Sequence, residues 1–199
     1  MYRGSGPRIL PIIVIIVVVA LVIAALITVG RLIFSGGSND SPQTNTASLQ
    51  DAVQNRSTDR SARWTVRGPI VADEKFRSYQ ITVSPSSRTF VTYSGYLEQV
   101  LETKTYDNNA RAYEEFVFAL TKAGITNTRK NADADLRGVC ATNGLAYSFE
   151  TLSNGTADNT IWSSSCRDSA GTMAADPLKI QALFINQIPD FKPIFNKVY

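Results

Sequence analysis

The longest hydrophobic run in the chain lies at its N-terminus. No charged residue occurs from Ile9 to Gly30, and nearly every side chain in this run is apolar. As a helix, such a run spans about 32 Å, close to the hydrocarbon thickness of a bilayer. Because lipid offers no partners to backbone N–H and C=O groups, a helix is expected in spite of the many β-branched residues. Residues 1–34 are therefore predicted to be a short stub and a transmembrane signal anchor, which contacts membrane lipid through residues 9–30.

Two other interpretations of the N-terminus stay open. A cleavable signal peptide has an apolar core of roughly 7–15 residues and a small-residue cleavage site. This run is longer, and the sequence Arg31-Leu32-Ile33-Phe34 follows it. A pilin-like subunit has a short basic leader ending in glycine, which Gly6 would supply, but Pro11 stands where that pattern has a glutamate. The second interpretation would make the chain an assembly subunit of a surface appendage.

The charges that flank the apolar run indicate its orientation. Arg3, Arg8 and the amino terminus precede the run, whereas Arg31 is followed by a neutral stretch. An excess of positive charge is retained in the cytoplasm. We therefore predict a single-pass protein of the cell membrane with a cytoplasmic N-terminus and residues 31–199 outside.

A polar segment follows the predicted anchor. Residues 35–62 are rich in Ser, Thr, Asn, Gln and Asp and contain few large apolar side chains. Such a segment buries too little surface to offset its loss of conformational entropy, and as a coil it would reach roughly 30 Å. We predict a flexible polar linker, and a short helix over 48–55 is compatible with this composition but not required by it.

Alternating apolar and polar positions then predict a sheet in residues 63–199. Trp64 and Val66 alternate with polar neighbours, as do Tyr79, Ile81 and Val83. Strands are predicted over 64–70, 79–83, 89–96, 145–151 and 160–166, with 97–106 as a strand or a connection and 139–141 as a short strand. The dipeptide Asn154-Gly155 predicts a hairpin turn between the last two long strands.

Two segments show the period of an amphipathic helix instead. The first has one apolar face made by Tyr113, Phe116, Val117, Leu120 and Ala123. Asn108 or Asn109 is expected to cap its start and Gly124 to end it. The second helix is predicted over 177–187, with Asp176 and Pro177 at its start. The fold class is therefore α+β, an antiparallel sheet with two amphipathic helices on one face.

Composition and charge exclude several function classes for this domain. The 15 basic and 14 acidic residues from Ser61 onward nearly cancel, so the domain has no electrostatic footprint for nucleic acid. Histidine, the commonest general base and transition-metal ligand, is absent. We predict no nucleic-acid partner, no cofactor and no metal site.

The two cysteines are Cys140 and Cys166. Outside the cytoplasm a paired cysteine is the default, and a bridge closing a loop of about 27 residues stabilises a fold by about 3–4 kcal/mol. A structural disulfide is therefore predicted. Free thiols are the alternative if the topology is inverted, and a redox role would ordinarily need a C-x-x-C motif or a histidine partner.

One segment has the spacing of a calcium-binding loop. Its oxygen-bearing positions are Asn131, Asp133 and Asp135, with Gly138 nearby. The pattern fails where Leu136 replaces the required glycine and Thr142 the bidentate glutamate, so a solvated loop is predicted. The carboxylate pairs Asp73-Glu74 and Glu114-Glu115 are likewise expected to be solvated.

Aromatic residues are concentrated in the first predicted strands. Most should pack in the core, but alternation is expected to turn some outward, and exposed aromatics are favoured at binding surfaces. The candidate binding surface consists of Trp64, Tyr79, Tyr93 and Tyr96.

Several short motifs carry a resemblance to a known group of proteins. These are Gly138-Val139-Cys140-Ala141, Trp162-Ser163-Ser164-Ser165-Cys166 and Gln187-Ile188-Pro189-Asp190-Phe191, together with the Ile/Val-rich anchor and the polar spacer. In this layout the chain resembles the small uncharacterised single-pass envelope proteins of Saccharibacteria-type bacteria. The resemblance implies no activity and assigns no functional residue.

The sequence therefore favours a non-enzymatic extracytoplasmic domain that binds a partner in the cell envelope or at the cell surface. A hydrolase that uses two carboxylates is the alternative from another class, and an appendage subunit is a third.

Overall fold

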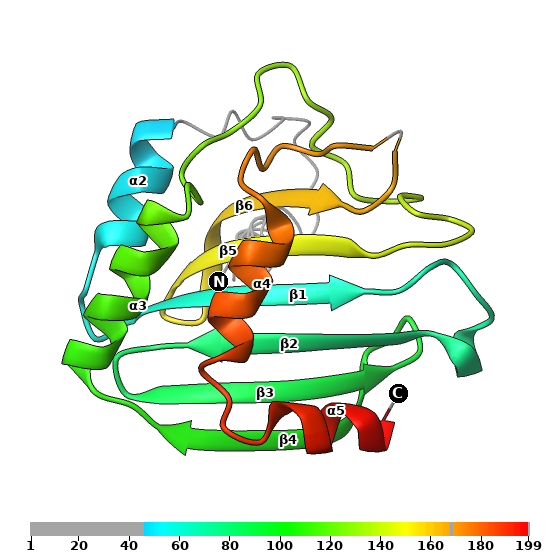
Figure 1. The fold of residues 1–199 in the computed structure, drawn as a ribbon, viewed down its shortest axis with the longest axis horizontal. Coiled ribbons are helices and arrows are strands. Elements are labelled where there is room, and N and C mark those ends of the chain that lie inside the picture. The colour runs from blue at the N-terminus through cyan, green and yellow to red at the C-terminus, as the bar shows by residue number, and fades with distance from the viewer. Residues whose placement is uncertain (1–45, 168, 199) are drawn as a thin grey trace, which may run out of the picture. The chain divides into compact units, whose positions relative to one another are not determined.

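The computed structural model describes residues 46–167 and 169–198 (Figure 1). The predicted anchor, residues 1–34, and the first part of the predicted linker lie outside the described residues. Among residues 46–167 and 169–198, none of the helices has the length and apolar character of a membrane span.

Six antiparallel strands form one sheet. Their bounds are β1 (Arg60–Arg67), β2 (Arg77–Val83), β3 (Ser87–Ser94), β4 (Gln99–Asp107), β5 (Ala146–Ser153) and β6 (Thr156–Ser164). The spatial order is β4-β3-β2-β1-β5-β6. The first four strands therefore form a meander, and β5 then returns to pair with the free side of β1. Strand β1 thus lies inside the sheet, between β2 and β5.

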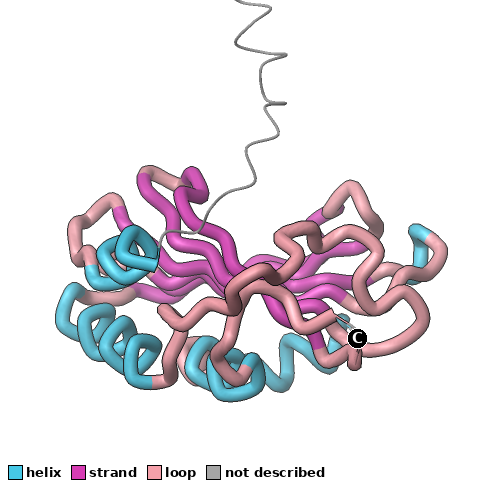
Figure 2. The backbone as a smooth tube through the Cα atoms, turned by 90° about the horizontal axis from the view of Figure 1, so that it is seen from above, coloured by secondary structure: helices cyan, strands magenta, loops and turns pink. Residues whose placement is uncertain are grey.

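Helices cover one face of this sheet. The helices are α2 (Thr46–Gln54), α3 (Ala110–Lys122), α4 (Pro177–Ile185) and α5 (Phe191–Val198), with a short 3-10 helix η1 (Asp73–Lys75). Figures 1 and 2 show α3, α4 and α5 against the same face, with α4 in front of the middle strands. The structure thus confirms the predicted α+β class with an antiparallel sheet.

Local sequence explains the ends of the two predicted helices. The side chain of Asn109 accepts a hydrogen bond from the Ala112 N–H at 2.9 Å, and Gly124 adopts a φ of 82° just after α3 ends. Asp176 accepts from the Leu178 N–H at 2.9 Å, and Pro177 opens α4.

The hairpin between β5 and β6 also follows from its sequence. Asn154 and Gly155 have φ values of 49° and 79°, which is the left-handed pair that a tight two-residue hairpin turn requires. The predicted strand at 139–141 is wrong, because that segment forms turns between α3 and β5.

The core forms where the central strand meets α4. The ring of Trp64 on β1 stacks between Tyr147 on β5 and Phe184 on α4, with centroid distances of 5.7 and 5.8 Å. All three side chains are buried. Phe149 and Phe116 pack around Phe184 and extend this cluster toward α3.

The domain begins earlier than the sequence pattern predicts. Helix α2 and the first residues of β1 occupy part of the segment 35–62, so the described part of that segment is not all flexible linker. Leu49 is 0% exposed and Val53 is 3% exposed. These two apolar residues, spaced i and i+4, lie on the same face of α2, and the rest of the segment is polar.

The sequence pattern also missed α5. Pro189 and Pro193 suggest an irregular end to the chain, yet Pro193 lies in the first turn of α5, where its missing N–H costs no helical hydrogen bond. Phe191 and Phe195 lie one turn apart on this helix and pack on Tyr79 of β2.

The cysteine pair is a disulfide, as predicted. Cys140 and Cys166 lie with their Cα atoms 5.7 Å apart and their sulfurs at bonding distance. The bond ties the segment between α3 and β5 to the end of β6. Gly144 lies against it, and a Cβ at that position would come within 2.6 Å of the Cys166 sulfur.

We predict that removing the disulfide lowers the free energy of unfolding. In the double variant Cys140→Ser/Cys166→Ser, the loss should be about 3.5 kcal/mol, because the unfolded chain gains the entropy that a loop of this length had removed. Urea unfolding of the oxidised protein, the reduced protein and the variant measures this. Equal stability of the oxidised protein and the variant would contradict the prediction.

A second prediction concerns α2. Leu49→Ala should lower the free energy of unfolding by about 2–4 kcal/mol, because it removes a fully buried side chain and leaves a cavity. The neighbouring exposed Gln50→Ala is the matched control and should change stability by less than about 0.5 kcal/mol. If both variants unfold like the parent, α2 does not belong to the folded domain.

Candidate functional site

The four aromatic residues of the candidate binding surface do not lie together. Trp64 is 0% exposed and Tyr79 is 3% exposed, and both point toward the helices. Tyr93 is half-buried on the opposite face of the sheet, where its hydroxyl donates to Gln80 at 3.1 Å. Tyr96, 40% exposed, lies in the turn between β3 and β4. Alternation along the strands separates these side chains, so the structure does not bring them to one surface.

A large cavity lies instead at the end of the sheet where β1 leaves and β2 begins. Its volume is about 690 Å³. Twelve residues line it: Val66, Gly68, Pro69, Val71, Glu74, Lys75, Arg77, Tyr79, Leu145, Gln181, Phe191 and Phe195. We call this space the α5 cavity, because α5 supplies two of its aromatic walls. Of the predicted aromatic residues, Tyr79 alone lines it.

Each wall of the α5 cavity comes from a different element. Val66 and Tyr79 project from the neighbouring strands β1 and β2, where they are register partners and share a face. Phe191 and Phe195 of α5 contact the Tyr79 ring at centroid distances of 5.7 Å each, edge to face. Gln181 on α4 donates from its amide to the Tyr79 hydroxyl at 2.8 Å. The cavity therefore exists only when the sheet, α4 and α5 are assembled.

The charged residues that line the α5 cavity come from η1 and from the start of β2, and the other residues that line it are uncharged. Burial raises the pKa of Tyr79 well above its ordinary value, so its hydroxyl stays protonated at neutral pH. Glu74 and Lys75 of η1 are exposed, and Arg77 at the start of β2 is half-buried. Three charged side chains thus line one part of a cavity that is otherwise mainly apolar.

Arg77 is held in place by its own hydrogen bonds. Its Nη1 donates to the Glu74 carbonyl at 2.9 Å, to the Phe76 carbonyl at 2.8 Å and to the Ser94 hydroxyl at 2.9 Å. These contacts fix one nitrogen of the guanidinium to the loop before β2 and to β3. A guanidinium fixed in this way is pre-organised for an acceptor in the cavity.

Sequence reasoning missed most residues of the α5 cavity. Gln181 lies in a helix that was predicted, but its partner Tyr79 could be found only from the packing of α4 on β2. Phe191 and Phe195 carry a usable signal, since they are spaced i and i+4 after Pro189. Glu74 and Lys75 gave no signal beyond a polar turn.

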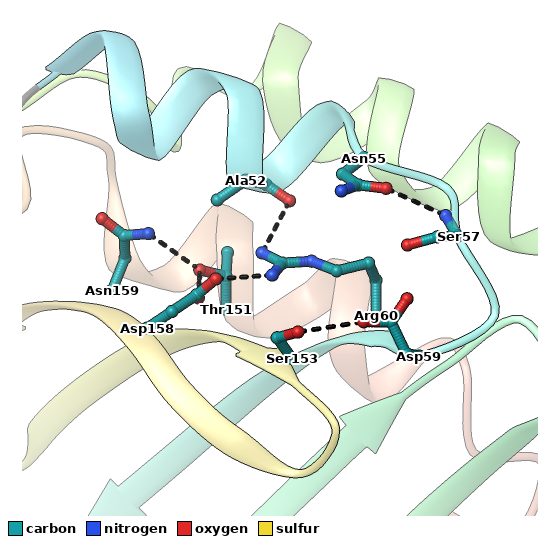
Figure 3. Close-up of polar contacts among 9 residues, drawn as sticks. All are labelled: Ala52, Asn55, Ser57, Asp59, Arg60, Thr151, Ser153, Asp158 and Asn159. Atoms are coloured by element: carbon teal, nitrogen blue, oxygen red, sulfur yellow. Dashed lines mark hydrogen bonds and ion pairs between the residues drawn. The ribbon is translucent and has the colours of Figure 1, made fainter.

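An ion pair between a buried arginine and an exposed aspartate lies at the other end of the sheet (Figure 3). Arg60 at the start of β1 donates from Nη1 to Asp158 of β6 and from Nη2 to the Ala52 carbonyl of α2 at 3.2 Å. The Arg60 side chain is 7% exposed. Thr151 donates its hydroxyl to the other oxygen of Asp158. This network joins α2 to the β5–β6 hairpin, and we assign it a structural role.

The carboxylate of Asp158 is stabilised in its charged form. Burial raises its pKa, but the hydrogen bonds from Arg60, Thr151 and Asn159, together with the positive charge of Arg60, outweigh burial and hold the pKa below its ordinary value. Asp158 therefore contributes stability above its unfolded pKa of about 4, and that contribution is lost as the pH falls through the lower folded pKa.

Three other carboxylates singled out in the sequence are paired with arginines, namely Glu114, Glu115 and Asp135. Glu114 contacts Arg56 at 2.6 Å, and Glu115 contacts Arg111 at 2.8 Å. In the predicted solvated loop, the Arg137 guanidinium holds the pKa of Asp135 at about 2. Among residues 46–167 and 169–198, no group of three His, Cys, Asp or Glu side chains is placed to hold a metal ion.

Comparison with known proteins finds no family model and no curated protein sequence that matches this chain.

We predict that Asp158→Asn lowers the free energy of unfolding at pH 7 by about 2 kcal/mol. The change leaves the buried Arg60 charge without its counter-ion. Solvent screens part of this cost, because the Asp158 side chain is 36% exposed. The deficit should shrink between pH 5 and pH 3, because the parent then loses the same interaction by protonation.

Urea unfolding at pH 3, 5 and 7 measures this difference. The matched control is Glu115→Gln, which removes an exposed ion pair and should change stability by less than about 1 kcal/mol at every pH. A deficit for Asp158→Asn that does not change with pH would contradict the role of its charge.

Proposed function

We propose that this chain is a membrane-anchored extracytoplasmic binding module and that the α5 cavity is its ligand-binding site. The observation that carries the proposal is the cavity itself. Its volume of about 690 Å³ lies within the range of small-molecule sites, and apolar walls surround a few polar groups, as in most such sites. The partner in the envelope is then a small, mainly apolar molecule.

The proposed location has two supports. The uncharged run from Ile9 to Gly30 has the length of a transmembrane helix. The sulfurs of Cys140 and Cys166 lie at bonding distance, and structural disulfides persist mainly in oxidising compartments outside the cytoplasm.

A binding role accounts for the cavity better than hydrolysis by carboxylates does. A pair of carboxylates facing one another across the substrate is the usual requirement for glycoside hydrolysis. Glu74 is the one carboxylate among the described residues that line the α5 cavity. Glu114 and Glu115 lie at a separate cavity of about 260 Å³, where Arg56 and Arg111 neutralise them.

We predict that a neutral long-chain alcohol bearing a photoreactive diazirine labels the walls of the α5 cavity. The experiment uses the full-length chain in lipid nanodiscs, and mass spectrometry locates the labelled residues, so that probe dissolved in the lipid does not affect the result. Leu145→Trp should reduce labelling of Phe191 and Phe195 at least fivefold, because the larger ring fills space that the ligand needs.

The matched control is Leu178→Trp. Leu178 is 63% exposed on α4 and does not line the α5 cavity, so this variant should be labelled like the parent. Thermal melts of both variants establish that they fold. Labelling confined to residues 9–30, or equal labelling of the two tryptophan variants at α5, would refute the proposed site.

A further inference from the structure

We infer that the α5 cavity binds a single-chain amphiphile with an anionic head group, of which a long-chain carboxylate is the simplest example. In this arrangement Lys75 and Arg77 bind the head group, and the apolar walls formed by Val66, Phe191 and Phe195 hold the hydrocarbon chain. The inference rests on the proposed function and adds the chemical class of the ligand to it.

The walls away from η1 suit a hydrocarbon chain. Val66 is 3% exposed and Phe191 is 8% exposed, and Phe195 packs beside them through its stacking contact with Phe191. The polar pair on this part of the wall, Tyr79 and Gln181, hydrogen-bond to one another at 2.8 Å. A second polar group inserted here would have to compete for those atoms, whereas a methylene chain buries apolar surface without that cost.

The head-group end is rich in hydrogen-bond donors. Lys75 is exposed and has no ion-pair partner among residues 46–167 and 169–198. Arg77 uses Nη1 for its three contacts with protein, and its Nε and Nη2 have no hydrogen bond within the same residues. These donors are two residues apart in the chain and line one cavity. Charge-assisted hydrogen bonds from such donors are those that a carboxylate accepts most strongly.

The sign of the head group follows from the charges that line the cavity. Lys75 and Arg77 are positive and Glu74 is negative, so the lining carries one net positive charge. The backbone carbonyl of Glu74 accepts a hydrogen bond from Arg77, and the side chain of Glu74 is exposed. A cationic head group would have to approach two positive charges to reach one negative charge, whereas an anionic head group gains a bidentate site on a fixed guanidinium.

The size and entrance of the cavity favour one chain rather than two. About 690 Å³ corresponds to one ligand of ordinary small-molecule size. Val71 and Leu145 line it and are each 37% exposed, so apolar side chains border its opening to solvent. An amphiphile that enters between these side chains places its chain against apolar surface.

The test compares three photoreactive probes that share one diazirine-bearing chain and differ in the head group. These are a carboxylate, an alcohol and a quaternary ammonium, each applied to the full-length chain in phosphatidylcholine nanodiscs. We expect half-maximal labelling of Phe191 and Phe195 by the carboxylate at a concentration at least tenfold lower than by the alcohol. The ammonium probe should label them most weakly.

Charge-reversal variants test the head-group site directly. Lys75→Glu should abolish the preference for the carboxylate, and Lys122→Glu, an exposed change on α3 outside the α5 cavity, should keep it. Arg77→Lys keeps the charge but loses the fixed guanidinium, so its preference should fall severalfold rather than vanish. Thermal melts verify that the variants are folded.

The outcomes separate this inference from the proposed function. If all three probes label the α5 cavity with the same half-maximal concentration, or if the ammonium probe has the lowest, the inference of an anionic head group is wrong. The α5 cavity then remains the proposed binding site. No labelling at α5 by any probe overturns both. Repeating the carboxylate arm in amphipol without lipid distinguishes a free amphiphile, labelled in both media, from one drawn from the bilayer, labelled in nanodiscs alone.

Discussion

Trp64 is fully buried at the centre of the domain. Its ring stacks on Tyr147 of β5 and on Phe184 of α4. One side chain of β1 thus contacts a neighbouring strand that is distant in sequence and a helix near the C-terminus. Burying an aromatic side chain of this size contributes roughly 4–6 kcal/mol. The indole N–H has no hydrogen-bond partner in the described part of the chain, at a cost of roughly 1–3 kcal/mol, which the burial of the ring exceeds.

Because β1 is fixed in this way, the two ends of the sheet take on different roles. At the end where β1 begins, Arg60 contacts both Asp158 and the Ala52 carbonyl, and these contacts connect the β5–β6 hairpin to α2 (Figure 3). At the end where β1 leaves the sheet, the chain must cross to η1 before β2 starts, and α5 covers Tyr79 without filling the space beside it. One end of the sheet is therefore stabilised by an ion pair, and the other end borders a mainly apolar cavity.

A near-neutral domain without histidine has few ways to recognise a partner through long-range charge or metal chemistry. Shape and apolar surface remain, and both are present in the α5 cavity. The proposed amphiphile uses them for its chain and uses only the local cations Lys75 and Arg77 for its head group. Such recognition is consistent with a domain tethered beside a lipid surface, which is the placement that we propose from the N-terminal run.

Elements with local signals could be predicted from the amino-acid sequence. The caps of α3 and α4, the Asn154-Gly155 turn and the alternation in β2 and β3 were all predictable, because each depends on neighbours in the chain. Three features became evident only from the folded chain: α2 belongs to the domain, Trp64 and Tyr93 lie on opposite faces of the sheet, and a cavity forms beneath α5. These features depend on contacts between segments far apart in sequence, and neither hydrophobic period nor composition specifies which distant surface a side chain will meet.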